Sequence, residues 1–277
     1  MRRFLQVDVF TATAGLGNPV AVVVDGEGLN EAQMARFAAW TNLSETTFVQ
    51  PAKDPEADYR VRIFTPRKEL PFAGHPTLGT CHALLDAGRL EPKERLLQEC
   101  AAGLIPIERS DDATLTFVAP PASAVPASTE AQIAELLGGI VVRDPLLVDV
   151  GPRWLTVRLA DAMDIDRLRP DFPAIAAATR EGGWTGLNVY GVGANGEVEL
   201  RSFAPADGID EDPVCGSGNA AVGQHLRETG AQELTGDRYQ ARQGRFLGRD
   251  GRIRVRIADR IEVGGPCVTV IDGNVAI

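Results

Sequence analysis

Short stretches near the start of the chain carry the hydrophobic patterns of β-strands. Residues 4–10 and 59–64 alternate apolar and polar side chains, and residues 20–24 are an unbroken run of valine and alanine. Alternation predicts a strand with one buried face, because successive side chains of a strand point to opposite faces of a sheet. Two glycines and a proline at 15–19 predict a turn that joins the first stretch to the apolar run as a hairpin.

Two further stretches have the spacing of helices. Residues 31–40 repeat apolar side chains on one face, and Asn30 with Gln33 has the sequence of a capping box. The Ala- and Leu-rich run 77–86 predicts a second helix that ends before Gly88. The first part of the chain is therefore expected to form strands wrapped about a helix.

The same two patterns describe the rest of the chain. Helices are expected at 129–137, with Ser128 or Thr129 as the cap, and at 171–180. Strands are expected within 96–107, 113–118, 146–150, 154–159, 187–192 and 197–203, and along the glycine-punctuated tail 239–270.

One segment of the chain recurs at a constant offset of 142 residues. The sequence PFAGHP at 71–76 corresponds to PVCGSG at 213–218, and FTP at 64–66 is echoed by FAP at 203–205, with three extra residues before the later glycine loop. An Ala-rich run, 219–228, follows the second copy as a helical run follows the first. Agreement in order and length predicts an internal duplication.

A proline-rich stretch divides the two copies. Residues 120–127 read PPASAVPA, which is typical of a linker. We therefore expect two domains, 1–120 and 121–264, with residues 265–277 returning to the first.

Composition narrows the class of protein. The chain has 277 residues, a net charge of −10 and a pI near 4.9, which argues against nucleic acid as a partner. No apolar run is long enough to span a membrane, and Asp8 interrupts the first apolar stretch too soon for a signal peptide. Four widely spaced cysteines without partner histidines predict reduced thiols in the cytoplasm and no zinc site.

His75 is the candidate for chemistry in the first copy. It lies between Gly74 and Pro76 at the expected start of a helix, where unpaired N–H groups can receive a carboxylate. A capping role and a catalytic role are both open for it. Glu45 among serines and threonines has, by itself, the pattern of a solvated surface group.

The second copy offers acids, a thiol and a hydroxyl. The acids at 210–212 either complement a helix dipole or exchange protons with a substrate. Cys215 is either a small buried residue or a thiol activated by a helix N-terminus. Ser217 does not match the G-x-S-x-G elbow, so a binding hydroxyl is favoured over a nucleophile.

Taken together, these motifs resemble the PhzF-like family of phenazine-biosynthesis isomerases, which belongs to the diaminopimelate-epimerase superfamily. The likeness covers nearly the whole chain. It rests, in family order, on VDVF at 7–10, GNPVAV at 17–22, LSET at 43–46, FTP at 64–66, ELPFAGH at 69–75 and EDPVCGS at 211–217.

The resemblance implies an α+β fold of two pseudo-symmetric domains, each a mixed sheet curled around a central helix, with the active site in the cleft between them. It implies a cofactor-independent isomerase, active as a homodimer, that moves a proton between carbons of a small carboxylate. The phenazine precursor, a dihydro-hydroxyanthranilate, is one candidate substrate.

The family's pattern also implies roles for particular residues. Glu45 is the expected acid/base, and His75 and Asp212 are the expected catalytic partners that arrange the substrate and its protons. The expected substrate-binding residues are Ser44, Gly74, Gly216 and Ser217, and Asn18 and Cys215 are two further candidates.

Two departures keep other functions open. The epimerase branch uses one cysteine in each glycine loop, but this chain has Ala73 in the first loop and Cys215 in the second. The PhzF-like pattern usually has Thr at the position of Cys215 and Ala at that of Gly218. The alternatives are an amino-acid epimerase that uses Cys215 with Glu45, and a non-catalytic carboxylate-binding protein.

Overall fold

The computed structural model of the protein describes residues 1–127 and 129–277. Contacts within the chain divide it into two compact units. Unit 1 contains Met1–Val118 and Gly264–Ile277, and unit 2 contains Ala119–Val263.

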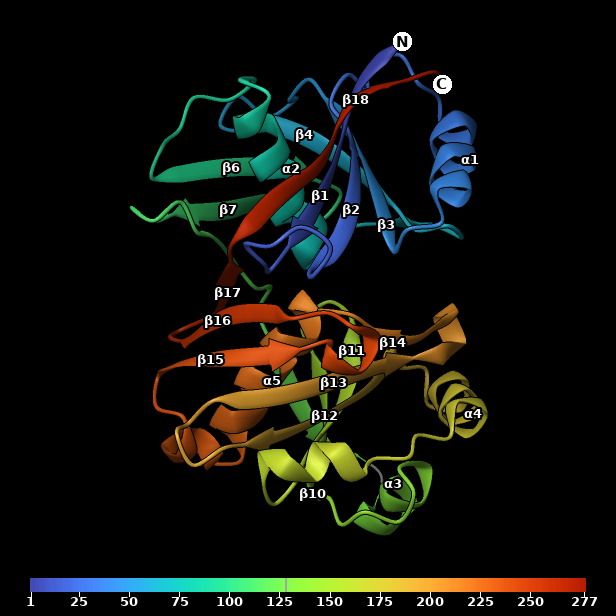
Figure 1. Cartoon of the computed structure of the whole chain (residues 1–277), viewed down its shortest axis with the longest axis vertical. Coiled ribbons are helices and arrows are strands. Elements are labelled where there is room, and N and C mark those ends of the chain that lie inside the picture. The colour runs from blue at the N-terminus through green and yellow to red at the C-terminus, as the bar shows by residue number, and fades with distance from the viewer. Residues whose placement is uncertain (128) are drawn as a thin grey trace. The chain divides into compact units, whose positions relative to one another are not determined.

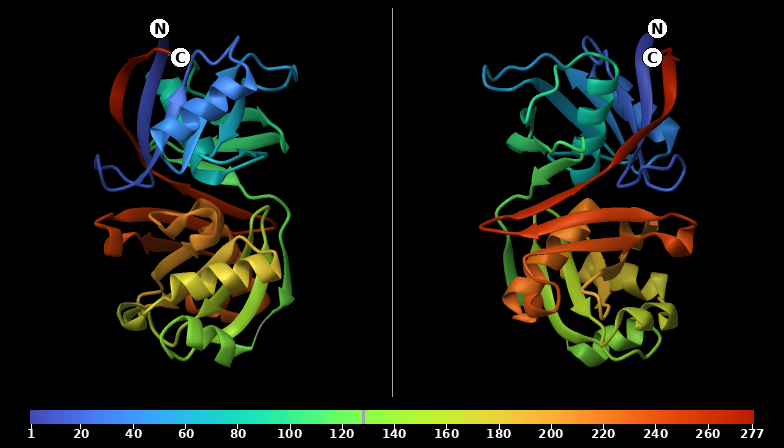
Figure 2. Two further views of the ribbon diagram at one scale, coloured as in Figure 1. Left: turned by 90° about the vertical axis from the view of Figure 1, so that its right-hand side faces the viewer. Right: turned by 60° about the vertical axis from the view of Figure 1, so that its left-hand side comes forward.

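Unit 1 is a mixed β-sheet around one central helix (Figure 1). Its strands are β1 (Arg2–Val9), β2 (Asn18–Val23), β3 (Glu45–Gln50), β4 (Tyr59–Phe64), β5 (Glu69–Leu70), β6 (Arg95–Cys100), β7 (Gly103–Arg109), β8 (Leu115–Val118) and β18 (Cys267–Val275). β1 pairs antiparallel with β2 on one side and with β18 on the other, so the two chain ends lie side by side (Figure 2). From β2 the sheet continues through β3, β4, β6 and β7, in parallel, antiparallel, parallel and antiparallel pairings.

Two helices cover the two faces of this sheet. α2 (Gly74–Asp86) is buried along most of its length and contacts β1, β2, β3, β8 and β18. α1 (Glu31–Thr41) packs on the opposite face, and the expected capping box of Asn30 and Gln33 is present. Because both faces are covered, β2 is apolar from Pro19 to Val23 rather than alternating.

Unit 2 repeats this plan. Its strands are β9 (Ser123–Pro126), β10 (Arg143–Asp149), β11 (Arg153–Arg158), β12 (Gly186–Val192), β13 (Val198–Ala204), β14 (Ile209–Asp212), β15 (Arg238–Gln243), β16 (Gly251–Ile257) and β17 (Ile261–Gly265), whose last two residues fall in unit 1. Its helices are α3 (Glu130–Leu136), α4 (Phe172–Gly182) and α5 (Gly216–Glu228), and short 3₁₀ turns lie at 162–167, 205–207, 231–234 and 245–247.

The duplication is visible in the strand pairings. β11, β12, β13, β15 and β16 pair in the same parallel, antiparallel, parallel, antiparallel order as their counterparts in unit 1. α2 and α5 are each 13 residues long and start 142 residues apart, at Gly74 and Gly216. The α+β fold with two units of the same topology is thus confirmed.

The proline-rich stretch differs from its expected form. Instead of an unstructured linker it contains β9, which pairs antiparallel with β10. The prolines lie before the strand and at its last residue, Pro126, so they do not interrupt it, and the pairing partner 20 residues later gives no local signal. Thr129 caps α3, and Ser128 lies outside the described residues.

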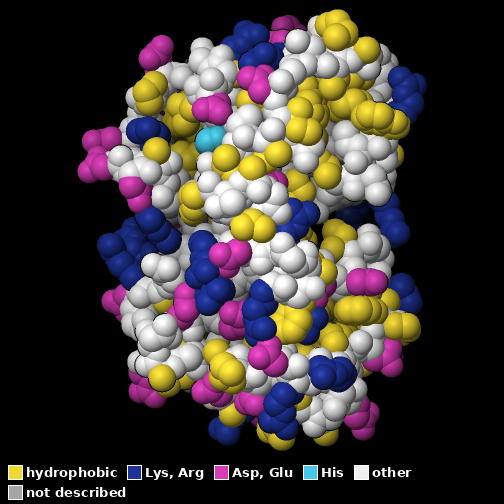
Figure 3. Space-filling model, viewed as in Figure 1, with side chains coloured by type: hydrophobic (Ala, Val, Ile, Leu, Met, Phe, Trp, Pro, Cys, Tyr) yellow, Lys and Arg dark blue, Asp and Glu magenta, His cyan; other side chains and the backbone are white. Residues whose placement is uncertain are grey.

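Charged side chains of both signs are interspersed on the face shown in Figure 3. Three arginines of β15 and β16 have acidic neighbours: Arg242 and Arg252 both contact Asp250, and Arg256 contacts Glu262. These arginines are therefore neutralised locally. Among the described residues, no helix is long and apolar enough to cross a membrane.

Candidate functional site

The candidate residues of unit 1 lie at one edge of its sheet. Asn18 is the first residue of β2 and Glu45 the first residue of β3, and the two strands run parallel, with Val20 opposite Glu45. Ser44 directly precedes β3. His75 is the second residue of α2, so the fold brings a strand edge and a helix N-terminus to the same place.

Glu45, His75 and Asn18 are in contact there. The Nε2 atom of His75 lies 3.2 Å from Oε2 of Glu45, and its Nδ1 atom lies 3.4 Å from Nδ2 of Asn18. Burial lowers the pKa of His75 to about 3, and a hydrogen bond with the Pro19 carbonyl only partly opposes this. The ring is therefore uncharged near neutral pH, and its contact with Glu45 is that of a neutral ring with a carboxyl group.

The start of α2 is suited to an anion. Its N-cap residue, Ala73, is extended and makes no side-chain cap hydrogen bond. Gly74 and His75 are buried in the first turn, where helix N–H groups lack partners within the helix. These donors and the positive end of the helix dipole favour a carboxylate.

In unit 2 the equivalent helix start is capped by a thiol. Cys215 is the N-cap of α5, and its Sγ accepts a hydrogen bond from the N–H of Gly218 at 3.2 Å. The Oγ of Ser217 lies 3.5 Å from the same Sγ and accepts a hydrogen bond from Nε1 of Trp154 at 3.1 Å. Gly216 begins the helix and is buried.

Asp212 lies directly before this loop, at the end of β14. Its Oδ1 accepts a hydrogen bond from the N–H of Val214 at 3.0 Å. The residue as a whole is partly accessible, but its carboxyl group is enclosed, and burial raises its pKa to about 6. The Cys215 thiol hydrogen-bonds to this carboxyl and partly opposes the increase.

Cys215 is not an activated thiol. It is 4% exposed, and burial together with the nearby Asp212 carboxyl raises its pKa well above the ordinary value. The hydrogen bonds from Ser217 and Gly218 oppose this only in part. The thiol form therefore dominates near neutral pH, although the sequence position predicts a site where a thiolate can form.

Two other ionisable groups of unit 2 have structural partners. Glu211, the middle acid of 210–212, forms a buried ion pair with Arg201 at 2.6 Å. His225 is held between the Tyr190 hydroxyl, 2.9 Å from Nδ1, and the Asp144 carbonyl, 2.6 Å from Nε2.

Two residues of the second loop's surroundings escaped the sequence analysis. Gln243, on β15, accepts from the N–H of Cys215 at 3.0 Å and donates to the Asp212 carbonyl at 3.0 Å. Nothing in the sequence links it to the loop 30 residues earlier. Trp154 has a signal only through the repeat, because β11 is the counterpart of β2, which contributes Asn18 in unit 1.

Gly218 departs from the family's pattern for a local reason. A Cβ at this position would lie 2.8 Å from Oγ of Ser202 and 3.0 Å from Oδ1 of Asn188. The alanine that the PhzF-like pattern usually carries would require these buried polar side chains to shift.

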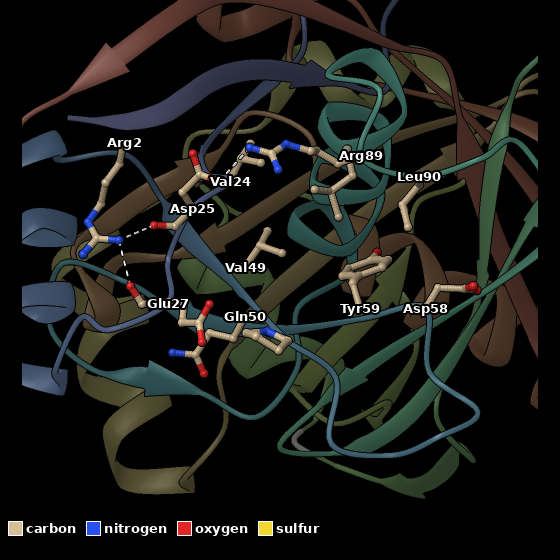
Figure 4. Close-up of a pocket in the computed structure, with 12 residues that line it drawn as sticks. Arg2, Val24, Asp25, Glu27, Val49, Gln50, Asp58, Tyr59, Arg89 and Leu90 are labelled. Carbon is tan, nitrogen blue, oxygen red and sulfur yellow. Dashed lines mark hydrogen bonds and ion pairs between the residues drawn. The ribbon is translucent and has the colours of Figure 1, made fainter.

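A surface depression of about 480 Å³ in unit 1 lies away from these residues (Figure 4). It is formed where β2 and β3 end, opposite the edge that holds Asn18 and Glu45. Its two arginines are engaged: Arg89 pairs with Asp25 at 2.8 Å, and Arg2 donates to backbone carbonyls. The chemistry of the site is therefore not in this depression.

Residues 1–127 and 129–277 contain no group of three or more side chains arranged to hold a metal ion, and their four cysteines are free.

Comparison with known proteins decides the family. The model of the phenazine biosynthesis-like proteins matches residues 7–273. The chain belongs to this family. A relative from Pseudomonas aeruginosa, trans-2,3-dihydro-3-hydroxyanthranilate isomerase, is 34% identical over 99% of both chains. A relative from Schizosaccharomyces pombe, named antisense-enhancing sequence 1, is 38% identical over 98% of this chain and 97% of its own.

Solved structures show the same fold. A PhzF-family protein of Bacillus anthracis is similar with a TM-score of 0.84 and 24% identity, over 100% of this chain and 99% of that one. A probable proline racemase of Agrobacterium radiobacter is similar with a TM-score of 0.67 and 17% identity, over 100% and 93%. The fold is therefore that of the diaminopimelate-epimerase-like proteins, and the chain is an isomerase of the PhzF-like family.

Proposed function

We propose that this isomerase moves a proton between carbons of a small carboxylate, with Glu45 as the acid/base. The observation that carries the proposal is the contact of the Glu45 carboxyl, 3.2 Å from an uncharged His75, at the uncapped start of α2. A carboxyl group beside a neutral ring is not held by an ion pair with that ring, so the contact leaves it able to take a proton and return it. The helix start beside it supplies N–H groups for the substrate carboxylate.

The other residues serve this transfer. His75 and Asp212 arrange the substrate and its exchangeable protons, and the Asp212 pKa of about 6 keeps that carboxyl close to proton exchange at neutral pH. Ser44, Gly74, Gly216 and Ser217 bind the substrate, and Asn18 holds the His75 ring. Cys215 supports the loop as an N-cap and does not transfer protons.

The two glycine loops differ in the groups that accompany them. Each unit carries one glycine loop at a helix start, while the candidate acid/base is present in unit 1 only: Glu45 begins β3, and the corresponding strand β12 begins with Gly186. From the resemblance to the family we also propose that the protein is homodimeric and cytoplasmic and needs no cofactor.

The proposed substrate class follows from the relatives' names. Several relatives are named trans-2,3-dihydro-3-hydroxyanthranilate isomerase. We propose a cyclic or aromatic-precursor carboxylate of this kind, and this compound is the first to test.

The test is proton exchange at carbon. The protein is incubated in deuterated water with trans-2,3-dihydro-3-hydroxyanthranilate and a panel of small carboxylates and amino acids, and NMR follows each carbon-bound proton. The proposal expects deuterium at a carbon of a shifted isomer. Binding without exchange across the panel would favour the non-catalytic alternative. Exchange only at the α-carbon of an amino acid, blocked by iodoacetamide, would favour the epimerase.

A further inference from the structure

Trp154 is held rigidly against the second glycine loop. It is the second residue of β11 and only 3% exposed. Its strand partner is Gly186, where a Cβ would lie 2.7 Å from Cζ3 of the indole ring. The glycine therefore makes room for the ring, and the packing fixes the direction of the indole N–H.

That N–H determines what the Ser217 hydroxyl can do. A tryptophan N–H can only donate, and it donates to Oγ of Ser217 at 3.1 Å. A serine hydroxyl has one hydrogen and two lone pairs, so this bond uses a lone pair and leaves the hydrogen to be donated elsewhere.

The neighbour of that hydrogen in the loop is a weak acceptor. Sγ of Cys215 lies 3.5 Å from Oγ of Ser217 and already accepts from the N–H of Gly218. A carboxylate at the start of α5 is a stronger acceptor than a thiol sulfur, because charge-assisted hydrogen bonds are roughly twice as strong as neutral ones.

Unit 1 has an equivalent contact, made by different side chains. Ser217 corresponds to His75 at the offset of 142, and His75 is met by Asn18 from the start of β2, the counterpart of β11. In both units, a side chain from the start of this strand contacts the second residue of the central helix.

We propose that Trp154 is a positioning residue that fixes the Ser217 hydroxyl as a hydrogen-bond donor toward the substrate carboxylate. The inference rests on the proposed function, because it specifies how Ser217 binds that carboxylate. It assigns a binding role to a tryptophan that does not itself reach the substrate.

The kinetic test is a double-mutant cycle with trans-2,3-dihydro-3-hydroxyanthranilate. Trp154→Phe keeps most of the ring and removes the N–H. We expect it to raise KM about tenfold, with kcat changed less than about twofold, because a hydrogen bond to a charged group is weakened. Ser217→Ala should raise KM at least as much, and adding Trp154→Phe to Ser217→Ala should change nothing further. Trp40→Phe, an exposed tryptophan on α1, is the control.

A second readout needs no turnover. The chain has three tryptophans, so ¹⁵N-labelled protein gives three indole N–H signals. We expect 3-hydroxyanthranilate to move the Trp154 signal downfield in the wild type, since a hydroxyl that donates to a carboxylate becomes a better acceptor. The Ser217→Ala variant should lose this response, and the corresponding carboxamide should not produce it.

The two readouts separate the inference from the proposed function. If no substrate undergoes exchange but the Trp154 signal responds to the carboxylate through Ser217, the positioning role stands and the proposed reaction is wrong. The positioning role is overturned if the effects of Trp154→Phe and Ser217→Ala on KM add up in the double variant. It is also overturned if the indole N–H signal of Trp154 does not shift when the carboxylate binds. A lower melting temperature with unchanged KM would likewise show a purely structural role.

Discussion

Burial changes the pKa of His75 and of Asp212 in opposite directions. It lowers the pKa of His75 to about 3 and raises that of Asp212 to about 6, because in both cases it disfavours the charged form. At neutral pH the histidine is therefore uncharged. The likeness to a family predicted both as site residues, but not their protonation, which depends on neighbours distant along the chain.

These pKa values predict how stability depends on pH. His75 and His225 have folded-state pKa values of about 3 and 4, against 6.5 ordinarily, so the unfolded chain binds more protons as pH falls below 6.5. Their effect is to lower the free energy of unfolding on acidification. Asp212, with a pKa of about 6 against 3.8, binds a proton first in the folded state and opposes this between pH 6 and 4.

Two variants should therefore change the pH dependence of the free energy of unfolding in opposite directions. We expect Asp212→Asn to lose stability more steeply from pH 6 to 4 than the wild type, by up to about 1.4 kcal/mol per pH unit. His225→Gln should lose it less steeply by a similar amount. Urea unfolding at several pH values measures both slopes. Slopes unchanged in both variants would show that these groups titrate normally.

Cys215 provides a second test at this scale. We expect Cys215→Thr to keep activity within a few-fold, because threonine is a better N-cap and its hydroxyl can accept from the N–H of Gly218. Initial rates with and without iodoacetamide measure this. A large loss of activity, together with substrate-protected inactivation of the wild type by iodoacetamide, would point to thiol chemistry.

Local sequence signals predicted the helices more accurately than they predicted the proline-rich stretch 120–127. Asn30 and Gln33 cap α1 as their spacing predicts, and the Ala- and Leu-rich run 77–86 predicted α2, which begins three residues earlier, at Gly74. β9 was missed because proline-rich composition marks a break in a helix or central strand, but says nothing of a partner 20 residues away. Trp154 and Gln243 were missed for the same reason, since their roles depend on pairings between distant segments.

The close packing of α2 against the sheet predicts how a substitution in this helix changes stability. A Cβ at Gly79 would lie 2.3 Å from Val20 Cγ1 and 2.9 Å from Val9 Cγ2, and both valines are fully buried. Gly79→Ala should therefore destabilise the protein by about 1–3 kcal/mol, despite alanine's higher helix propensity. Gly273→Ala on β18, where a Cβ would meet nothing within 4 Å, is the control. Equal stability of the two variants in chemical denaturation would show that α2 packs less closely.

At the scale of the whole molecule, the duplicated topology carries unlike chemistry in its two halves. α2 begins with an uncapped Ala73–Gly74 step and has Glu45 nearby, whereas α5 is capped by Cys215 and has Asp212 nearby. Strand order is kept by the core of each unit, while the residues at the helix starts are free to diverge. The sequence repeat could predict the shared topology of the two units. Only the family likeness could predict the different residues at their helix starts.

The central claim is that Glu45 carries the proton. The most direct measurement compares wild type and Glu45→Gln for deuterium incorporation at carbon when trans-2,3-dihydro-3-hydroxyanthranilate is isomerised in deuterated water. Glutamine preserves size and removes only the proton-carrying function, so we predict a loss of about 10²- to 10⁴-fold in the exchange rate with an unchanged fold. Exchange in the variant at more than about a tenth of the wild-type rate, a difference below ~1.4 kcal/mol, would show that another group moves the proton.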